Sequence, residues 1–191
     1  MPRYDAEWIG SMMSAERARQ TRPRRLLRAA GAQPGVDVVD YGAGPGFFAL
    51  PAAQIVGPTG RVKAVEVEPR MHDEIRRRAR EAGLRNVEPI TPEAAARLPD
   101  GWAGLVIAAL FLHDFPPERR DELLPELRRL CAPDGRLLVV EWVAPGGLAG
   151  PSTPNRFAVG DLAGLLRRHG FRPGRPRRLG ESYFSILGRP T

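Results

Sequence analysis

Short apolar segments alternate with charged segments along most of the chain. The apolar segments are rich in valine, isoleucine and leucine, which is typical of strands buried on both faces of a sheet. The expected strands are residues 36–41, 61–67, 86–90, 105–111 and 136–142, and the expected helices between them are 47–56, 69–82, 92–97 and 116–131. This regular alternation predicts an α/β fold, with a mostly parallel sheet covered by helices on both faces.

The two ends of the chain add elements to this alternation. Residues 14–30 are expected to be helical in two pieces, because Ser14 can cap the first piece and Pro23 kinks the helix or starts a second one. A helix over 158–169 is followed by two expected strands, 171–179 and 182–188, that are antiparallel neighbours. The pattern predicts a seven-stranded sheet in one domain covering residues 1–191.

Composition narrows the class of protein. No apolar run approaches the roughly 18–20 residues that cross a bilayer, so no membrane partner is expected. The first ten residues include Asp5 and Glu7 and lack the apolar core of a signal peptide. Cys131 is the only cysteine, which excludes an internal disulfide framework. These features predict a cytoplasmic protein.

The net charge of +7 comes almost entirely from arginine, since Lys63 is the only lysine. A basic balance can indicate a nucleic-acid or other acidic partner. The chain is also rich in Arg, Ala, Gly and Pro throughout, which favours a compositional bias over a dedicated basic surface. A nucleic-acid partner therefore stays open without being favoured.

A glycine-rich turn follows the first expected strand. In VVDYGAGPGFF, Gly42, Gly44 and Gly46 stand between a strand and a helix, where they allow a tight turn and close approach to a ligand. Glu66 ends the next strand, 20 residues after Gly46. A carboxylate there can accept hydrogen bonds from both hydroxyls of a ribose. The two features together predict a site for an adenosine-type ligand.

The glycine spacing is G-x-G-x-G, not the G-x-G-x-x-G of dinucleotide sites, which disfavours a nicotinamide dehydrogenase. Preceded by Asp40, it resembles the first motif of the class I S-adenosylmethionine (SAM)-dependent methyltransferases. The segments GRVKAVEVEPRM, GLVIAALFLHDF and LRRLCAPDGRLLVVEW resemble later motifs of that family, in the same order. The nearest style is the ubiquinone/menaquinone or type 11 group. The resemblance implies a Rossmann-like fold with SAM as cofactor and S-adenosylhomocysteine (SAH) as product.

The resemblance also implies roles for individual residues around the cofactor. Glu66 would hold the ribose, and Val67 would pack on the adenine. The chain has Ala94 where the family often has an acid for the adenine amino group, and the adjacent Glu93 is a candidate substitute. The residues implied to surround or line the methionine part are Asp40, Gly42, Ala43, Gly44, Gly46, Ala109 and Leu110.

Candidates for the substrate side follow the fourth and fifth strands. His113 could serve as a general base, or it could be a structural histidine beside the fourth strand. Asp114 is expected to cap the helix that begins near Pro116. Trp142 could wall a pocket or belong to the core. No pair of histidines has metal-ligand spacing, so no metal site is expected.

The N-terminal segment, residues 1–30, is expected to be a helical lid. Tyr4, Trp8 and Met12 form an apolar and aromatic set there, and in similar enzymes such a segment folds over the cofactor. The alternative is a helix packed on the core or on a partner. Arg156, after the Gly/Pro-rich segment 144–155, is a further pocket candidate.

The expected function is SAM-dependent methyl transfer to a small molecule. Two alternatives stay open: a methyltransferase acting on RNA or protein, and a non-catalytic SAM-binding or interaction module. The first rests on the arginine-rich stretches 17–28 and 167–178, and the second on the missing adenine-side acid. The sequence identifies neither the methyl acceptor nor the oligomeric state.

Overall fold

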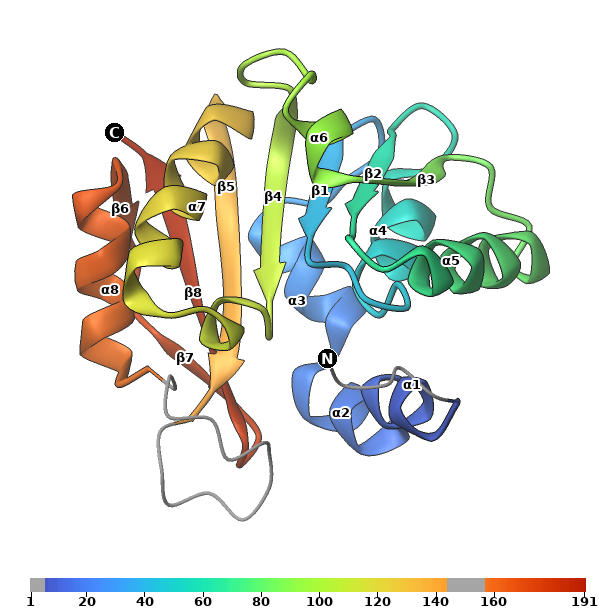
Figure 1. The fold of residues 1–191 in the computed structure, drawn as a ribbon, viewed down its shortest axis with the longest axis horizontal. Helices are drawn as coiled ribbons and strands as arrows, with labels where there is room; N and C mark the ends of the chain where they lie inside the picture. The colour runs from blue at the N-terminus through green and yellow to red at the C-terminus, as the bar shows by residue number, and fades with distance from the viewer. Residues whose placement is uncertain (1–5, 144–156) are drawn as a thin grey trace.

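A computed structural model describes residues 6–143 and 157–191, with side chains described from residue 9 onward. The described residues form one eight-stranded sheet, drawn in Figure 1. Its strands are β1 (Val38–Tyr41), β2 (Val62–Val65), β3 (Val87–Ile90), β4 (Ala103–Ala109), β5 (Cys131–Trp142), β6 (Phe171–Pro173), β7 (Arg177–Leu179) and β8 (Tyr183–Pro190). The order across the sheet is β3-β2-β1-β4-β5-β8-β6, and β7 also pairs with β8. The predicted α/β fold with a mostly parallel sheet is confirmed.

Strands β1 to β5 are parallel, and the three C-terminal strands are antiparallel to their neighbours. The chain order reverses beside β1, because β2 lies on one side of it and β4 on the other. In open sheets of this kind, ligands bind outside the carboxyl ends of the strands at such a reversal. The topology therefore places the candidate site at the end of β1.

Helices cover both faces of the sheet. They are α1 (Ala6–Met12), α2 (Ala15–Thr21), α3 (Pro23–Ala30), α4 (Ala49–Val56), α5 (Pro69–Glu81), α6 (Pro92–Ala95), α7 (Pro117–Leu130) and α8 (Val159–Arg168), with a short 3-10 helix η1 (Leu112–Asp114). The buried apolar residues of α3 and α4, together with Ile75 of α5, belong to one apolar cluster, and those of α6, α7 and α8 belong to the other. Helices α1 and α2 lie beyond the carboxyl ends of the parallel strands (Figure 1).

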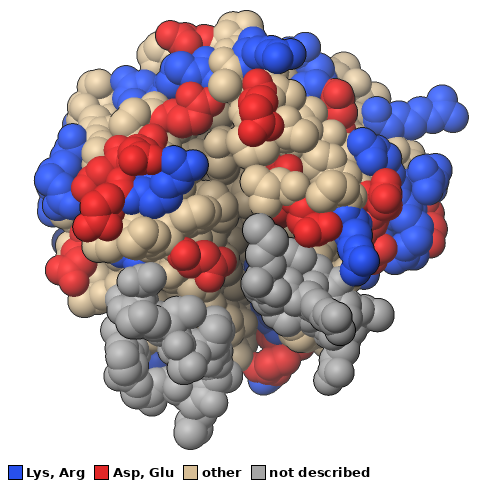
Figure 2. Space-filling model, viewed as in Figure 1, with Lys and Arg blue, Asp and Glu red and all other residues tan. Residues whose placement is uncertain are grey.

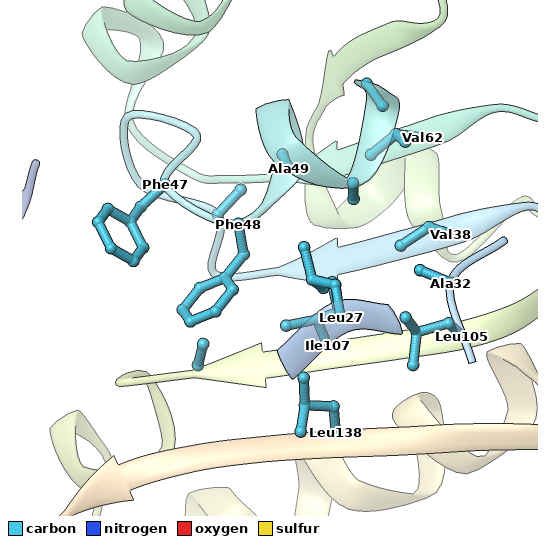
Figure 3. Packing of buried hydrophobic residues seen from close by; sticks show 14 of the residues in the cluster. Leu27, Ala32, Val38, Phe47, Phe48, Ala49, Val62, Leu105, Ile107 and Leu138 are labelled. Carbon is cyan, nitrogen blue, oxygen red and sulfur yellow. The ribbon is translucent and has the colours of Figure 1, made fainter. Parts of the chain in front are cut away.

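The apolar core between β1, β4 and the helices α3 and α4 fixes the glycine-rich turn in place. Phe48, which directly precedes α4, is 2% exposed and packs in the same cluster as Leu27 of α3 and Ile107 of β4. Figure 3 shows these side chains between the strands and the two helices. The turn is therefore anchored by a large buried side chain on its helical side.

Several predicted helix ends are confirmed by their caps. The side chain of Ser14 accepts a hydrogen bond from the backbone N–H of Arg17, as expected of a helix start. Pro23 begins α3, directly after Arg22 ends α2 in the left-handed conformation. The predicted cap at Asp114 is wrong, because Pro116 occupies the N-cap position of α7 and makes no side-chain cap bond. Asp114 lies in η1 instead.

The sheet differs from the expectation at three places. The predicted strand 171–179 is two strands, β6 and β7, which raises the total from seven to eight. The fourth strand is Ala103–Ala109 and not 105–111, because Leu110 takes a positive φ of 53° that turns the chain out of the sheet. The predicted turn at 133–135 lies inside β5, where the pairing with β4 shifts register between Ala103 and Leu105.

Candidate functional site

The predicted site residues that the structure describes meet at the carboxyl ends of the parallel strands. The glycine-rich turn follows β1, and Glu66 is the first residue after β2. His113 lies in η1, just beyond β4, and Trp142 ends β5. Because β1, β2, β4 and β5 are parallel, these groups share one edge of the sheet (Figure 1).

The glycine-rich turn has a backbone that requires glycine. Gly42, Gly44 and Gly46 have φ angles of 76°, 53° and 91°, a region that L side chains rarely adopt. A Cβ atom on Gly42 would lie 2.2 Å from the ring of Phe111, and one on Gly44 would lie 2.6 Å from Cε of Met12. The turn therefore exposes backbone without side chains of its own at the three glycines, and the side chains of Phe111 and Met12 contact this backbone.

The carboxylate of Glu66 faces the glycine-rich turn. Its Oε2 accepts a hydrogen bond from the backbone N–H of Gly44 at 2.8 Å. Its Oε1 accepts hydrogen bonds from the N–H groups of Val67 and Glu68 at 2.7 and 3.1 Å. A carboxylate offers about four lone-pair sites, so about one remains. Accepting both hydroxyls of a ribose therefore requires Glu66 to release one of these backbone contacts.

Two buried charged groups meet beside this turn. Asp40, at the end of β1, is 1% exposed, and its Oδ2 has no hydrogen-bond partner. Burial raises the pKa of Asp40 from 3.8 to about 7, although the Ala49 N–H and the charge of Arg17 oppose the shift. Arg17 of α2 is 9% exposed, and its Nε also lacks a partner. Burial lowers the pKa of Arg17 to about 10, which leaves it a cation at neutral pH.

The raised pKa of Asp40 predicts a pH-dependent stability. Unfolded, this carboxyl loses its proton near pH 4, whereas in the folded chain it keeps it until about pH 7. Between these values the folded state binds more protons, so rising pH lowers the free energy of unfolding. We expect Asp40→Asn to gain stability relative to the wild-type chain between pH 4.5 and pH 8. Urea unfolding of both chains at both pH values measures this, and an unchanged difference would contradict it.

A small cavity of about 40 Å³ lies where these groups meet. Its lining residues are Met12, Arg17, Asp40, Gly42, Ala43, Pro45, Phe47, Phe48, Ala109 and Leu110. These include five of the seven residues that the sequence assigns to the methionine part of the cofactor. Ligand sites usually measure about 300–1,000 Å³. A nucleoside therefore enters only if Met12 and Phe111, which lie on the turn, move aside.

Val67, Glu93 and Ala94 lie on the β2–β3 side of the site. Val67 is 70% exposed, a solvent-facing apolar surface directly after Glu66. Glu93 is exposed in α6, and its pKa is lowered by a hydrogen bond from Thr91, the residue that caps the helix. Ala94 donates its backbone N–H to the same threonine at 3.3 Å. Their predicted adenine contacts stay predictions.

His113 and Glu141 form a buried pair behind the site. The Nδ1 atom of His113 lies 2.7 Å from Oε2 of Glu141, and the backbone N–H of His113 donates to Oε1 at 3.3 Å. The two residues are 3% and 1% exposed. The other ring nitrogen, Nε2, lies 3.3 Å from the carboxylate of the exposed Asp114. The imidazole is therefore held between two carboxylates, one buried and one exposed.

The remaining substrate-side candidates divide between described and undescribed residues. The rings of Trp142 and Tyr183 are tilted against each other with their centroids 4.5 Å apart, and Trp142 packs against the core. Trp8 lies in α1, but its side chain is outside the described residues, as are Tyr4 and Arg156 entirely. Among the described residues, no three His, Cys, Asp or Glu side chains gather as a metal site. In the same residues, no helix is both long and apolar enough to cross a bilayer.

Sequence reasoning missed the part of α2 in this site and the role of Glu141. Arg17 lies on the buried face of α2, and Thr21 lies one turn later on the same face. The spacing of these two positions in the sequence could have indicated that Arg17 faces the core. Glu141 is an acid within a strand otherwise apolar from Leu137 to Val140, and a buried acid requires a partner. Its partner, 28 positions earlier in the chain, is not visible in the sequence.

Basic residues are distributed over the surface, and several arginines also line a groove formed by two adjoining cavities. Figure 2 shows acidic and basic side chains interspersed on the face that carries α7 and α8. Cavities of about 480 and 530 Å³ lie between α3 and the strands β6–β8, and they share no lining residue with the small cavity. Arg25, Arg175 and Arg177 line them without an acidic partner among the described residues, and no aromatic residue lines either cavity. The groove therefore lacks platforms for base stacking.

Comparison with known proteins shows the family of this chain. Residues 38–135, from β1 into β5, match the family model described as a methyltransferase domain. The chain belongs to this methyltransferase family. S-adenosylmethionine is the cofactor of the family. The matched residues contain the glycine-rich turn, Glu66 and His113, whereas Arg17 and Glu141 lie outside them.

Similar curated proteins act on different molecules. The chain is 33% identical over 143 residues to nocamycin O-methyltransferase of Saccharothrix syringae, covering 73% of this chain and 47% of that protein. It is 30% identical over 124 residues to the ubiquinone/menaquinone biosynthesis C-methyltransferase of Shewanella pealeana, covering 64% of this chain and 49% of that protein. The chain therefore spans about half the length of these relatives.

A solved structure matches nearly the whole chain. A SAM-dependent methyltransferase from Aquifex aeolicus superposes with a TM-score of 0.86 at 25% identity, covering 97% of this chain and 98% of that one. An N1-methyltransferase from Burkholderia thailandensis, solved with 1,6-didemethyltoxoflavin and SAH bound, has a TM-score of 0.70 at 24% identity, covering 91% and 79%. The Rossmann-like methyltransferase fold is confirmed.

The residues at the carboxyl edge fit a SAM-type cofactor. The bare turn at Gly42–Gly46 lets a ligand approach the backbone, and Oδ2 of Asp40 is a buried acceptor in need of a donor. A SAM molecule has an ammonium group that can donate there. Its adenosine end requires an acceptor for the ribose, and Glu66 stands one strand away.

Proposed function

We propose that this chain transfers the methyl group of SAM to a hydroxyl group of a small molecule, with His113 as the base that accepts the hydroxyl proton. The buried His113–Glu141 pair at the carboxyl edge carries the proposal. The cofactor supplies an activated methyl group on a sulfonium, so the acceptor needs only correct placement and the removal of its proton.

The geometry supports a proton acceptor at Nε2 of His113. With its proton on Nδ1, the ring donates to Glu141, and in this tautomer Nε2 carries no proton and can accept one. When Nε2 takes the acceptor's proton, the imidazolium lies between the carboxylates of Glu141 and Asp114, at 2.7 and 3.3 Å. The acceptor oxygen forms its new bond to the methyl carbon as the sulfur–methyl bond breaks, and the bond electrons stay on sulfur.

Access to His113 requires a change of shape. The ring is 3% exposed, so an acceptor reaches Nε2 only when neighbouring side chains move. Phe111 is two residues before His113 and rests on Gly42. The movement that admits the cofactor therefore also changes the surroundings of the base.

For the cofactor, we assign the ribose to Glu66 and the adenine to the exposed face of Val67. Glu93 is the candidate to bind the adenine amino group, because it is adjacent to Ala94, which stands where the family often has an acid. The three backbone bonds that orient the Glu66 carboxylate support the first assignment. The N-terminal helices, through Met12 on Gly44, support the assignment of residues 1–30 as a lid over the site.

Replacing Glu66 tests the ribose assignment. We expect Glu66→Ala to weaken SAH binding by about 1–3 kcal/mol, because charge-assisted hydrogen bonds to the ribose are lost. Isothermal titration with SAH measures this. Glu68→Ala is the matched control, because Glu68 only caps α5 through the N–H of Arg70. Equal SAH affinity in the Glu66→Ala variant and the wild-type chain would show that Glu66 does not contact the sugar.

Screening acceptors by chemical class tests the proposed function. Purified chain is incubated with labelled SAM and panels of phenols, enols, amines and thiols, and SAH release and methylated product are both measured. Transfer to hydroxyl compounds is expected. Transfer confined to amines or thiols would refute the hydroxyl assignment, and SAH binding without any transfer would favour the alternative of a non-catalytic SAM-binding module.

RNA or protein methylation has less support in the structure. The arginine-lined groove beside α3 shares no residue with the cavity at the glycine-rich turn. A macromolecular substrate bound there would still have to reach the carboxyl edge of the sheet. Adding RNA and peptide to the acceptor panel separates this alternative from the small-molecule proposal.

A further inference from the structure

The small cavity at the glycine-rich turn is lined by two residues that each have a buried polar atom without a partner. Nε of Arg17 is a donor, and Oδ2 of Asp40 is an acceptor. Both residues line this cavity, and both are at least nine-tenths buried. Buried polar groups in folded proteins are almost always hydrogen-bonded. Two unpartnered polar atoms on one cavity therefore indicate a ligand that has both a hydrogen-bond acceptor and a hydrogen-bond donor.

The α-amino acid end of SAM has this pair of groups. Its ammonium can donate to Asp40, and its carboxylate can accept from a guanidinium, whose fork of N–H groups matches a carboxylate. We propose that Arg17 of α2 binds the α-carboxylate of the cofactor and makes the site selective for a cofactor with an intact amino acid. The inference rests on use of the family cofactor and is independent of the methyl acceptor.

Contacts around Arg17 hold the guanidinium in place for this role. One terminal nitrogen donates to the carbonyl oxygen of Met12 at 2.9 Å. The guanidinium carbon lies 4.3 Å from the centre of the Phe47 ring, a cation–π contact. These two contacts fix the group on one side and leave Nε unpaired. Asp40 interacts electrostatically with Arg17, and the cofactor's ammonium would also engage that carboxyl group.

The same contacts link the cofactor to the N-terminal helices. Met12 ends α1, its side chain rests on Gly44, and its carbonyl oxygen binds Arg17. Met12 must leave Gly44 for the cofactor to fit, and Arg17 must stay near the cavity to reach the carboxylate. The position of α2 is therefore part of the binding site, which the match over residues 38–135 does not include.

The decisive experiment removes the carboxylate from the ligand and the guanidinium from the protein separately. SAM and decarboxylated SAM are titrated into the wild-type chain and into Arg17→Met. We expect the wild-type chain to bind SAM about 10- to 100-fold more tightly than decarboxylated SAM, the range for a charge-assisted hydrogen bond. In the Arg17→Met variant, we expect the affinity for SAM to fall to nearly the affinity for decarboxylated SAM. The affinity for decarboxylated SAM should differ by less than about threefold between the variant and the wild-type chain.

Controls separate a ligand contact from a structural role. Arg19→Met removes an exposed arginine of the same helix that pairs only with Glu16, and it should bind both ligands as the wild-type chain does. If Arg17→Met weakens both ligands equally, Arg17 only supports the turn and the proposal fails. If the variant does not fold, the wild-type comparison of the two ligands still decides, because equal affinities would overturn the proposal. If the wild-type chain does not bind SAM at all, the chain does not use this cofactor.

Discussion

The His113→Asn variant is expected to lose about 10²- to 10⁴-fold in kcat, the usual contribution of a positioned general base. An asparagine amide can still donate toward Glu141, as the Nδ1 side of the imidazole does now at 2.7 Å. It has no ring nitrogen to take the acceptor's proton. Steady-state kinetics with a hydroxyl acceptor from the screen measures the loss, and SAH affinity should stay unchanged because His113 does not line the cofactor cavity.

Glu141→Gln distinguishes a base from a structural histidine. If Glu141 orients the imidazole and stabilises its charged form, this variant lowers kcat and shifts its pH profile, while the fold persists. A purely structural pair would lower the melting temperature and leave kcat of the folded fraction unaltered. An active His113→Asn variant with the kcat of the wild-type chain would eliminate the base from the mechanism.

The Phe48→Ala variant is expected to lose about 3–5 kcal/mol of stability, the usual range for truncating a buried phenylalanine. Phe48 is 2% exposed and joins the glycine-rich turn to α4 inside the cluster shown in Figure 3. Removing its ring leaves a cavity beneath the turn. For a chain of this length, about 2–4 °C of melting temperature is lost per kcal/mol, so a decrease of about 6–20 °C should be seen by calorimetry.

Val67→Ala is the matched control for this measurement. Val67 lies on the same edge of the sheet but is 70% exposed, so its truncation should change stability by less than about 0.5 kcal/mol. Its SAH affinity should fall slightly if the adenine packs on it. If the free energy of unfolding of the Phe48→Ala variant lies within about 1 kcal/mol of the wild-type value, the neighbouring core residues have filled the space left by the ring.

The order and type of most elements could be predicted because apolar runs and helical spacing are local properties of the sequence. The interruption between β6 and β7 was missed because both segments pair with β8 and only the sheet shows the gap between them. Pro133-Asp134-Gly135 is a turn sequence and predicts a turn, but here it stays inside β5, beside the register shift in the pairing with β4. The end of β4 depends on the positive φ of Leu110, which no local rule assigns to leucine.

The site was predictable where it is local and not where it depends on packing. The glycine-rich turn and Glu66 come from adjacent elements, so their spacing revealed them. The groups that meet His113 and Asp40 come from distant segments: Glu141 of β5 pairs with His113, and Arg17 of α2 lines the same cavity as Asp40. Burial decides both arrangements, because a buried carboxylate or guanidinium is stable only with compensating charge or hydrogen bonds. Only the assembled fold brings these groups together.

The antiparallel strand β8 has a consequence for how this protein is made. It lies between β5 and β6, and it is also the pairing partner of β7. Until residues 183–190 are synthesised and released, β5 keeps an open edge and neither β6 nor β7 has its partner. An open edge on an apolar strand invites pairing with other chains. A nascent chain emerging from the ribosome therefore passes through a stage exposed to aggregation, which ends only when this segment inserts.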